Sequence, residues 1–325
     1  MIISKNAIEY STEIIMDWIF YLGHEVERLN GDTFENSAND IFIDSEASLK
    51  VRINNNTVKN DYYSIWIRRW SDYSNVSNLI NKADQLKTTI GLGRTLSNCL
   101  LEDTNAVRNS VLRNFKGKKY LSTPSQLSVN KINVLQQAKK CGFNIPKFIF
   151  TNRKKYLAEF IKEKENVIIK DLEGQFSLFQ NDKAYMSYAE LLDEDKFNQL
   201  PDEFCLSFFQ EYIEKEYEIR TFVLENKLYS MAIFSQKDKQ TKVDFRRYNF
   251  DTPNRAVPYQ LPKHIEKKAL QLMRIVGLNT GSIDILKSEN GNYYFLEVNP
   301  VGQFGMVSEP CNYNLEYEIA NYLTT

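Results

Sequence analysis

The sequence predicts an α+β protein in which a small α/β domain precedes two α+β subdomains. Three features support this prediction. Helical and strand-like patterns alternate near the N-terminus, a stretch with Pro, Ser and Asn at 122–130 marks a boundary, and two β-hairpins follow in the second half of the chain. The expected domains are therefore residues 1–125, 126–205 and 206–325.

The N-terminal domain is expected to begin with a packed helix. Apolar side chains recur at helical spacing over residues 8–22, and short apolar runs at 40–44 and 64–70 read as strands. Residues 78–120 read as helical and polar. Their basic run RNFKGKK, residues 113–119, is expected to be a solvated loop.

The rest of the chain is expected to form an α/β layer followed by antiparallel strands. The predicted elements are a helix from Lys131 to Cys141, a strand at 147–150, a helix at 153–164, a strand at 166–170, a strand at 205–213 and a hairpin at 218–234.

Composition excludes several classes of function. The net charge of −1 gives no global attraction to nucleic acid or to a membrane surface. No stretch approaches the roughly 18 consecutive apolar residues of a membrane span. We therefore expect a cytoplasmic protein with neither nucleic acid nor membrane as partner. The four cysteines lie far apart and the chain has two histidines, so a zinc site is not expected and the cysteines are expected to be reduced.

An acidic residue stands in an apolar strand near the C-terminus. The segment GSIDILKSENGNYYFLEVNP has two apolar runs joined by Asn290-Gly291, a dipeptide typical of a two-residue type I′ hairpin turn. With these two residues as the loop, Asp284 faces Glu297 across the hairpin, with β-carbons about 4.5–5.5 Å apart. Two facing carboxylates repel, so we expect them to oppose folding unless a cation lies between them.

The same face of this hairpin offers a third oxygen. Asn299 lies two residues beyond Glu297 and points to the same side by strand alternation. Carboxylates on a rigid support, together with substrate phosphates and water, are the ligands that Mg²⁺ prefers. Asp284, Glu297 and Asn299 are therefore candidate magnesium ligands. The alternative is a surface hairpin whose acids are solvated.

Charged residues at strand ends are candidates for nucleotide contacts. Lys170 ends the apolar strand NVIIK, where an ammonium suits a phosphate oxygen. Glu211 and Glu218 flank a segment whose backbone and carboxylates suit a purine edge and ribose hydroxyls, and Arg220 shares the face of Glu218. Each of these taken singly is also consistent with ordinary surface charge.

Taken in order, these residues resemble the ATP-grasp superfamily, in which two α+β subdomains clasp ATP. The resemblance covers about residues 126–325 and rests on Lys131, Lys170, QEYI, Glu218, DFR at 244–246, Asp284 and EVNP. It implies ATP and Mg²⁺ as cofactors. The implied roles are Lys131 and Lys170 at the phosphates, Glu211, Tyr212 and Ile213 at adenine, Glu218 at ribose, Arg246 at the phosphates or an acyl phosphate, and Lys170, Arg220 and Arg246 as catalytic residues. One departure concerns the phosphate-covering loop KDLEGQFSLF, which has a single glycine, Gly174, where many relatives have several.

Flanking motifs resemble a narrower family over nearly the whole chain. SIWIRRW, VDFRRYN and FLEVNPVGQFG are similar to the ATP-grasp peptide maturases of graspetide biosynthesis, especially those of grasp-with-spasm systems. The resemblance implies phosphorylation of Asp or Glu side chains in a ribosomally made precursor peptide, with a leader and an acidic, Ser/Thr-rich core. A Ser or Thr hydroxyl or a Lys amine then attacks, which gives macrocyclic ω-esters or ω-amides. A radical SAM SPASM protein is a further implied partner, and a homodimer is among the oligomeric states left open.

Arginine pairs are candidates for holding an acidic peptide, because arginine binds carboxylates through two parallel hydrogen bonds. Arg68 and Arg69 follow an apolar strand, and Arg247 follows Arg246. For Arg68 and Arg69, interdomain salt bridging is the alternative.

Two other functions remain open at this stage. An ATP-grasp carboxylate–amine ligase would add free amino acids to a peptide, and a non-catalytic ATP-binding carrier would present a peptide to another enzyme. A carrier would be expected to have lost its metal triad, and this chain retains Asp284, Glu297 and Asn299.

Overall fold

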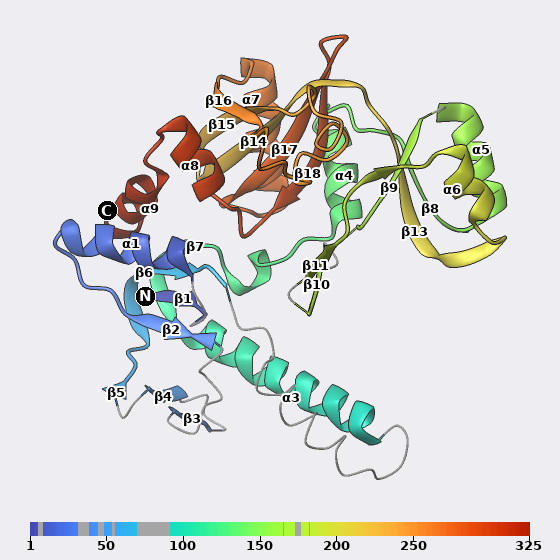
Figure 1. The fold of residues 1–325 in the computed structure, drawn as a ribbon. Helices are drawn as coiled ribbons and strands as arrows, with labels where there is room; N and C mark the ends of the chain where they lie inside the picture. The colour runs from blue at the N-terminus through green and yellow to red at the C-terminus, as the bar shows by residue number, and fades with distance from the viewer. Residues whose placement is uncertain are drawn as a thin grey trace. The chain divides into compact units, whose positions relative to one another are not determined.

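The computed structural model describes residues 1–5, 9–31, 39–44, 49–53, 56–69, 92–164, 166–172, 177–181 and 183–325. They form two compact units, one combining Met1–Ser128 with Asn314–Thr325 and the other comprising Val129–Tyr313 (Figure 1). The last helix therefore belongs with the N-terminal unit, although the sequence places it in a domain that spans 206–325. No helix within the described ranges is long and apolar enough to cross a membrane.

The N-terminal unit contains a four-stranded parallel sheet in the order β2-β1-β6-β7. Its strands are β1 (Ile2–Ser4), β2 (Arg28–Asn30), β6 (Asp61–Ile67) and β7 (Lys116–Leu121), and a small second sheet joins β3 (Asn39–Ile43), β4 (Leu49–Ile53) and β5 (Asn56–Thr57). The helices are α1 (Tyr10–Tyr21), α3 (Leu92–Asn114) and α9 (Leu315–Thr324), with a 3₁₀ turn at Pro124–Gln126. Parallel strands with covering helices match the α/β arrangement expected for this part of the chain.

The basic run at 113–119 is not the solvated loop that the sequence predicts. Helix α3 ends at Asn114, the side chain of Phe115 is buried, and β7 begins at Lys116. Because β7 is the edge strand of its sheet, its lysines are placed where natural sheets favour charge. The loop was predicted from the basic composition of this segment, which does not distinguish a solvated loop from an edge strand.

The second unit is built from two larger sheets and a hairpin. A five-stranded antiparallel sheet has the order β16-β15-β14-β17-β18, a four-stranded sheet has the order β12-β9-β13-β8, and β10 pairs with β11. The strands are β8 (Phe148–Arg153), β9 (Val167–Lys170), β10 (Ser177–Gln180), β11 (Lys183–Met186), β12 (Glu190–Leu191), β13 (Glu203–Glu211), β14 (Lys215–Leu224), β15 (Lys227–Phe234), β16 (Arg255–Tyr259), β17 (Thr280–Ser288) and β18 (Tyr293–Asn299). The helices are α4 (Lys131–Lys140), α5 (Lys154–Lys164), α6 (Glu194–Gln199), α7 (Lys263–Ile275) and α8 (Gly305–Cys311).

Strand alternation divides the five-stranded sheet into an apolar face and a polar face. Ile219, Ile283 and Phe295 are buried in one cluster with apolar residues of α4 and α7. The neighbouring residues Glu218 and Asp284 point to the opposite face. Helices α4 and α7 therefore cover the apolar face, and the polar face is available for a site.

The four-stranded sheet has a smaller core of its own. Leu157 and Phe160 of α5 pack with Val167 of β9 and Phe209 of β13. This packing fixes β9, which ends at Lys170, beside β13, which ends at Glu211. Two predicted site residues are thereby carried on neighbouring strands.

The turn between β17 and β18 differs from the predicted one. The backbone N–H of Ser288 donates to the carbonyl of Asn292 at 2.9 Å, which leaves a three-residue loop, Glu289–Gly291. Gly291 has φ of 83°, the left-handed conformation that such a loop needs at its last position. The expected two-residue type I′ turn is therefore wrong.

A β-bulge in β18 restores the predicted pairing. Ile285 pairs with Phe295, whereas Asp284 pairs with Glu297, so Leu296 is the extra residue. The longer turn shifts the register by one residue and the bulge shifts it back. The predicted opposition of Asp284 and Glu297 is thus confirmed, although the turn from which it was derived is not.

Candidate active site

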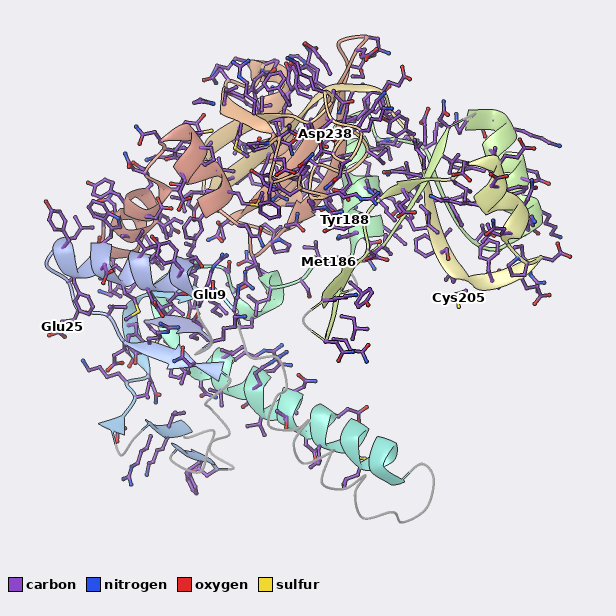
Figure 2. All side chains as sticks on the ribbon, viewed as in Figure 1. Glu9, Glu25, Met186, Tyr188, Cys205 and Asp238 are labelled. Carbon is purple, nitrogen blue, oxygen red and sulfur yellow. The ribbon has the colours of Figure 1, made fainter. Side chains whose placement is uncertain are left out.

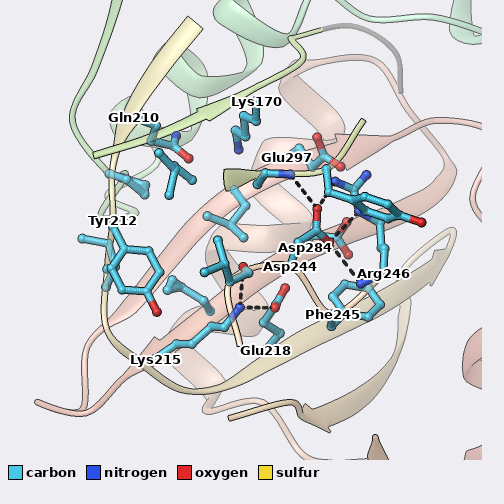
Figure 3. A pocket seen from close by; sticks show the side chains of 18 of the residues that line it. Lys170, Gln210, Tyr212, Lys215, Glu218, Asp244, Phe245, Arg246, Asp284 and Glu297 are labelled. Atoms are coloured by element: carbon cyan, nitrogen blue, oxygen red, sulfur yellow. Dashed lines mark hydrogen bonds and ion pairs between the residues drawn. The ribbon is translucent and has the colours of Figure 1, made fainter. Parts of the chain in front are cut away.

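A pocket in the second unit gathers most of the predicted site residues (Figure 3). Those among its lining residues are Lys131, Lys170, Glu211, Tyr212, Ile213, Glu218, Arg220, Arg246, Asp284 and Glu297. They come from the two larger sheets, from the connection between β13 and β14, from the start of α4 and from the segment that follows β15.

Four charged side chains form a row along one end of the pocket. Arg220, Asp284 and Glu297 are successive partners across β14, β17 and β18. Arg220 donates from Nε and Nη2 to the two oxygens of Asp284, both at 2.8 Å. Lys131, from the first turn of α4, donates to Glu297 Oε2 at 2.9 Å.

This row corrects the expectation that the facing carboxylates repel without relief. Each acid has a cation of the protein as its partner, and the Arg220–Asp284 pair is buried. The N-cap of α4 fixes the position of Lys131, the first residue of the helix. The side chain of Asn130 accepts a hydrogen bond from the backbone N–H of Asn133 at 3.0 Å. The acids are therefore compatible with a folded protein that has no metal.

The three predicted metal ligands do come together. Asn299 Nδ2 lies 3.3 Å from Asp284 Oδ2 and 3.2 Å from Glu297 Oε1. In this rotamer the amide nitrogen faces the acids, so a half-turn of the amide would direct its oxygen to a cation. Across the described part of the chain, no group of three His, Cys, Asp or Glu residues is suited to a metal. Two carboxylates and an amide fit a Mg²⁺ that takes its other ligands from phosphates and water.

Fixed charges shift the pKa values in this row. Burial alone would raise the pKa of Glu297, but the positive charges of Lys131 and Lys170 and the hydrogen bonds from Lys131 and Asn299 lower it to about 2. Burial lowers the pKa of Lys170, and repulsion from Lys131 and Arg246 also lowers it, against the attraction of Glu297, which raises it. Among the described residues, Lys170 makes no hydrogen bond or ion pair, although its ammonium lies 5.6 Å from the ring centre of Phe208. The pocket therefore holds a cation that is ready for an anion.

Arg246 is held by the carboxylate two residues before it. Asp244 Oδ1 accepts from the backbone N–H and from Nε of Arg246, at 3.0 and 2.9 Å, and Oδ2 accepts from Nη2 at 2.6 Å. Asp244 Oδ2 also accepts from the backbone N–H of Ala189 at 3.0 Å. Asp244 thus ties Arg246 to the segment before β12, and sequence reasoning gave this acid no role of its own.

Sequence reasoning missed Lys215, which lies deep in the pocket. Lys215 and Glu218 are three residues apart, a spacing that puts side chains on opposite faces of a regular strand. The ladder of β14 with β17 shifts register at Glu216, and this β-bulge turns Lys215 to the face of Glu218. Lys215 then donates to the Glu218 carboxylate and to the carbonyl of Val243, the latter at 3.0 Å.

Two polar groups of the pocket have no partner in the described part of the chain. The side chain of Gln210 is buried, yet its Nε2 makes no hydrogen bond, and the same is true of the Tyr212 hydroxyl. A buried unpaired donor costs about 1–3 kcal/mol, so such groups indicate a missing partner. The sequence signal was available, since Gln210 immediately precedes Glu211 in the motif QEYI.

The remaining predicted residues lie elsewhere. Arg247 does not line the pocket and is exposed. Arg68 and Arg69 belong to the N-terminal unit, where their Nε atoms lie 3.9 and 3.2 Å from the carboxylate oxygens of Glu9, which Figure 2 labels. These ion pairs lie within one unit and are not interdomain bridges. Burial, with the neighbouring charge of Arg69, lowers the pKa of Arg68 to about 10 against the opposing effect of Glu9. Gly174 falls outside the described residues.

Comparisons with known proteins agree with this architecture. The family model of the RimK-like ATP-grasp domain matches residues 128–323. A probable alpha-L-glutamate ligase of Vibrio atlanticus (strain LGP32) is 31% identical over 172 residues, which are 50% of this chain and 53% of that protein. The chain thus matches only about half the length of this relative.

Two solved structures share the fold over nearly the whole chain. The macrocyclase MdnC of Microcystis aeruginosa MRC, bound with the precursor peptide MdnA, is 22% identical with a TM-score of 0.79 over 99% of this chain and 98% of that one. A RiPP-associated ATP-grasp ligase of Chryseobacterium gregarium, in complex with ADP and a leader and core peptide, is 24% identical with a TM-score of 0.83 over 99% and 95%. At these identities the likeness shows the fold alone.

Proposed function

Because the chain belongs to the RimK-like ATP-grasp family and has the fold that its sequence predicts, we propose that it is an ATP-dependent peptide macrocyclase. It would phosphorylate Asp or Glu side chains of a ribosomally made precursor peptide and link them to Ser/Thr hydroxyls or Lys amines. The observation that carries this proposal is the pocket, in which Arg246 is ordered and Lys170 has no hydrogen bond or ion pair among the described residues, beside a row of paired acids.

Each part of ATP has matching groups in the pocket. The unpaired amide of Gln210 and the backbone of Glu211–Ile213 suit the donor and acceptor pattern of a purine edge. Glu218 suits the ribose hydroxyls. Lys131, Lys170 and Arg246 would meet the phosphates, whose charge would also reduce the repulsion that lowers the pKa of Lys170.

Asp284, Glu297 and Asn299 would hold Mg²⁺. When bound, the ion would neutralise phosphate charge that the lysines leave unpaired. Two of these ligands already accept from cations of the protein, namely Asp284 from Arg220 and Glu297 from Lys131. Magnesium would therefore share these carboxylates with Arg220 and Lys131.

In this reaction the protein contributes positive charge and positions the reactants, and no nucleophilic side chain is needed. An oxygen of the peptide carboxylate attacks the γ-phosphorus, the bond to the bridging oxygen breaks and ADP leaves. A hydroxyl or amine of the same peptide then attacks the acyl carbon, loses its proton and expels phosphate. Lys170 and Arg246 would stabilise the charge on the transferring phosphoryl group, which is the usual larger part of such catalysis.

The chemistry of exposed arginines and the shared fold support a peptide as the substrate. Arg247 is exposed beside Arg246 and can meet an acidic side chain, whereas Arg68 and Arg69, which both pair with Glu9, stay candidate peptide ligands. The two solved proteins with this fold were crystallised with precursor peptides. A radical SAM SPASM partner, a homodimer and a cytoplasmic location stay predictions.

Mass spectrometry tests the proposal. The purified protein is incubated with ATP, Mg²⁺ and a candidate precursor, chosen by searching the neighbouring reading frames for a short peptide rich in Thr/Ser and Asp/Glu. Macrocyclisation removes one water per bond formed, and the Lys170→Ala variant should leave the peptide unchanged. Addition of an amino-acid residue mass would instead identify a ligase for free amino acids. An unchanged peptide with bound ATP and no ADP formed would identify a carrier.

A further inference from the structure

Lys215 connects two parts of the pocket that the proposed function uses separately. Its ammonium donates to the carboxylate of Glu218 on one side and to the carbonyl of Val243 on the other (Figure 3). The two side chains of the ion pair are only 6% and 10% exposed. Lysine is rarely buried without a specific partner, so this placement needs a reason.

The Val243 contact leads to Arg246. Val243 immediately precedes Asp244, and the carboxylate of Asp244 holds Arg246 through three hydrogen bonds of 2.6–3.0 Å. The hydrogen bond from Lys215 therefore fixes the backbone from which Arg246 is positioned.

The Glu218 contact leads to the nucleotide. Burial, together with the negative charges of Asp244 and Asp284, raises the pKa of Glu218, and the charge of Lys215 opposes that rise. Lys215 binds Oε1, which leaves Oε2 of the same carboxylate able to accept a hydroxyl. Glu218 can thus bind a ribose hydroxyl while Lys215 keeps its hydrogen bonds to Glu218 and to the Val243 carbonyl.

We propose that Lys215 is a positioning residue that couples ribose binding at Glu218 to the placement of Arg246 at the phosphates. The inference rests on the proposed function, because it takes Glu218 as the ribose ligand and Arg246 as a phosphate ligand. Ribose and Lys215 then stabilise the same conformation of the segment 243–246, so nucleotide binding orders the arginine that acts on its phosphates.

Equilibrium binding gives the first test and needs no turnover. ADP and 2′,3′-dideoxy-ADP are titrated calorimetrically into the wild type, Glu218→Gln and Lys215→Met. The wild type should prefer ADP by roughly tenfold or more, the value of a hydrogen bond to a charged group. Both variants should lose most of that preference. Lys287→Met is the matched control, since Lys287 pairs with Glu216 at 3.1 Å on neighbouring strands and does not line the pocket.

Hydrogen exchange of the segment 241–247 gives the second test. ADP should protect this segment in the wild type and in Lys287→Met, 2′,3′-dideoxy-ADP should protect it less, and neither should protect it in Lys215→Met. If Lys215→Met does not fold, the double variant Lys215→Met/Glu218→Gln replaces it, because it leaves no unpaired buried charge at these two positions. It is compared with Glu218→Gln alone, which keeps the bond to Val243. With ADP, Glu218→Gln should show the reduced protection that 2′,3′-dideoxy-ADP gives the wild type, and the double variant should lose protection altogether and show a further fall in kcat.

Two outcomes would overturn the inference in different ways. If Lys215→Met keeps the ribose preference and the protection of the wild type, Lys215 is structural only and the nucleotide assignment survives. If the wild type binds no ADP, or Glu218→Gln keeps the full ribose preference, the proposed nucleotide site fails and the role of Lys215 fails with it.

Discussion

The two faces of the five-stranded sheet use alternate residues of the same strands for opposite purposes. On the face covered by α4 and α7, Ile219 and Ile283 are almost fully buried among other apolar groups. On the pocket face, Arg220 and Asp284 are also buried, but as an ion pair. Apolar burial contributes about 25 cal/mol per Å², whereas the attraction within a buried ion pair barely offsets its desolvation. The comparison teaches that one face carries most of the stability and the other carries the chemistry, so substitutions should separate the two.

The largest expected effect on stability is on the apolar face. Leu272 of α7 is fully buried in the main core and does not line the pocket. Leu272→Ala should lower the free energy of unfolding by about 2–5 kcal/mol, through lost burial and the cavity left behind. Urea unfolding measures the loss, and calorimetry at a temperature where the variant is folded should give an unchanged Kd for ADP. A weakened Kd in the folded variant would show that the faces are not separable.

On the pocket face, Lys170→Ala should impair activity and leave stability unchanged. Loss of the free ammonium should lower the rate of peptide modification by about 10²–10³, or roughly 3–4 kcal/mol of transition-state stabilisation. The free energy of unfolding should not fall, because burial and like charges already disfavour the charged lysine. Urea unfolding and the modification assay are run on the same preparation. A destabilised variant would place Lys170 among the structural residues.

Lys170 also predicts a pH dependence of stability. Its pKa is lowered in the folded state from the ordinary value of 10.5, so the unfolded state binds more protons between the two values. The contribution of this residue should therefore become more favourable as pH rises toward 10.5. The difference in unfolding free energy between wild type and Lys170→Met should shift in favour of the wild type over that range. A difference that is flat with pH would mean that the ammonium is not disfavoured in the fold.

Arg246→Ala should have a smaller and more specific effect. Its side chain is 41% exposed and its guanidinium is held by Asp244, so ground-state ATP binding should change little. We expect kcat to fall about 10- to 100-fold, because its charge would matter most on the transferring phosphoryl group. Comparison of kcat with the Kd for ADP makes the distinction. An equal loss in Kd with kcat preserved would place Arg246 on the bound nucleotide only.

Sequence patterns predicted these faces better than they predicted the contacts within them. The register counted from Asn290-Gly291 placed Asp284 opposite Glu297, although the turn itself is one residue longer, and the start of α4 at Lys131 was also correct. These features depend on local turn and helix-start residues, which a sequence displays directly. The family resemblance then named residues that the pocket brings together.

The contacts that were missed depend on single-residue irregularities. The bulge at Glu216 turns Lys215 into the pocket, and the bulge at Leu296 offsets a turn that is one residue longer than expected. A bulge shifts the alternation by one residue and leaves no fixed signature in composition. The cations that neutralise Asp284 and Glu297 come from another strand and from a helix, so reading the hairpin alone suggested repulsion where there is pairing.

Glu297→Gln gives the finest test of the comparison, because it asks whether an acid on the chemical face also stabilises the fold. The pKa of Glu297 falls from the ordinary 4.5 to about 2 on folding, so its carboxylate adds stability above pH 4.5 that is lost as pH falls toward 2. Glutamine keeps the shape and can still accept from Lys131, so we expect a loss of only about 1–2 kcal/mol at neutral pH in EDTA. Reading the hairpin alone gives the opposite sign.

With Mg²⁺ and ATP the difference in unfolding free energy between wild type and Glu297→Gln should widen. Ligand at a hundredfold excess over Kd stabilises the wild type by about 2.7 kcal/mol. The variant should gain less, because one of its metal ligands is weakened. Unfolding curves of both proteins, in EDTA at several pH values and then with Mg²⁺ and ATP, measure both effects. Equal stability in EDTA would mean that the ion pair with Lys131 contributes nothing to the fold. An equal gain with Mg²⁺ and ATP would remove Glu297 from the metal site and leave it a structural partner of Lys131.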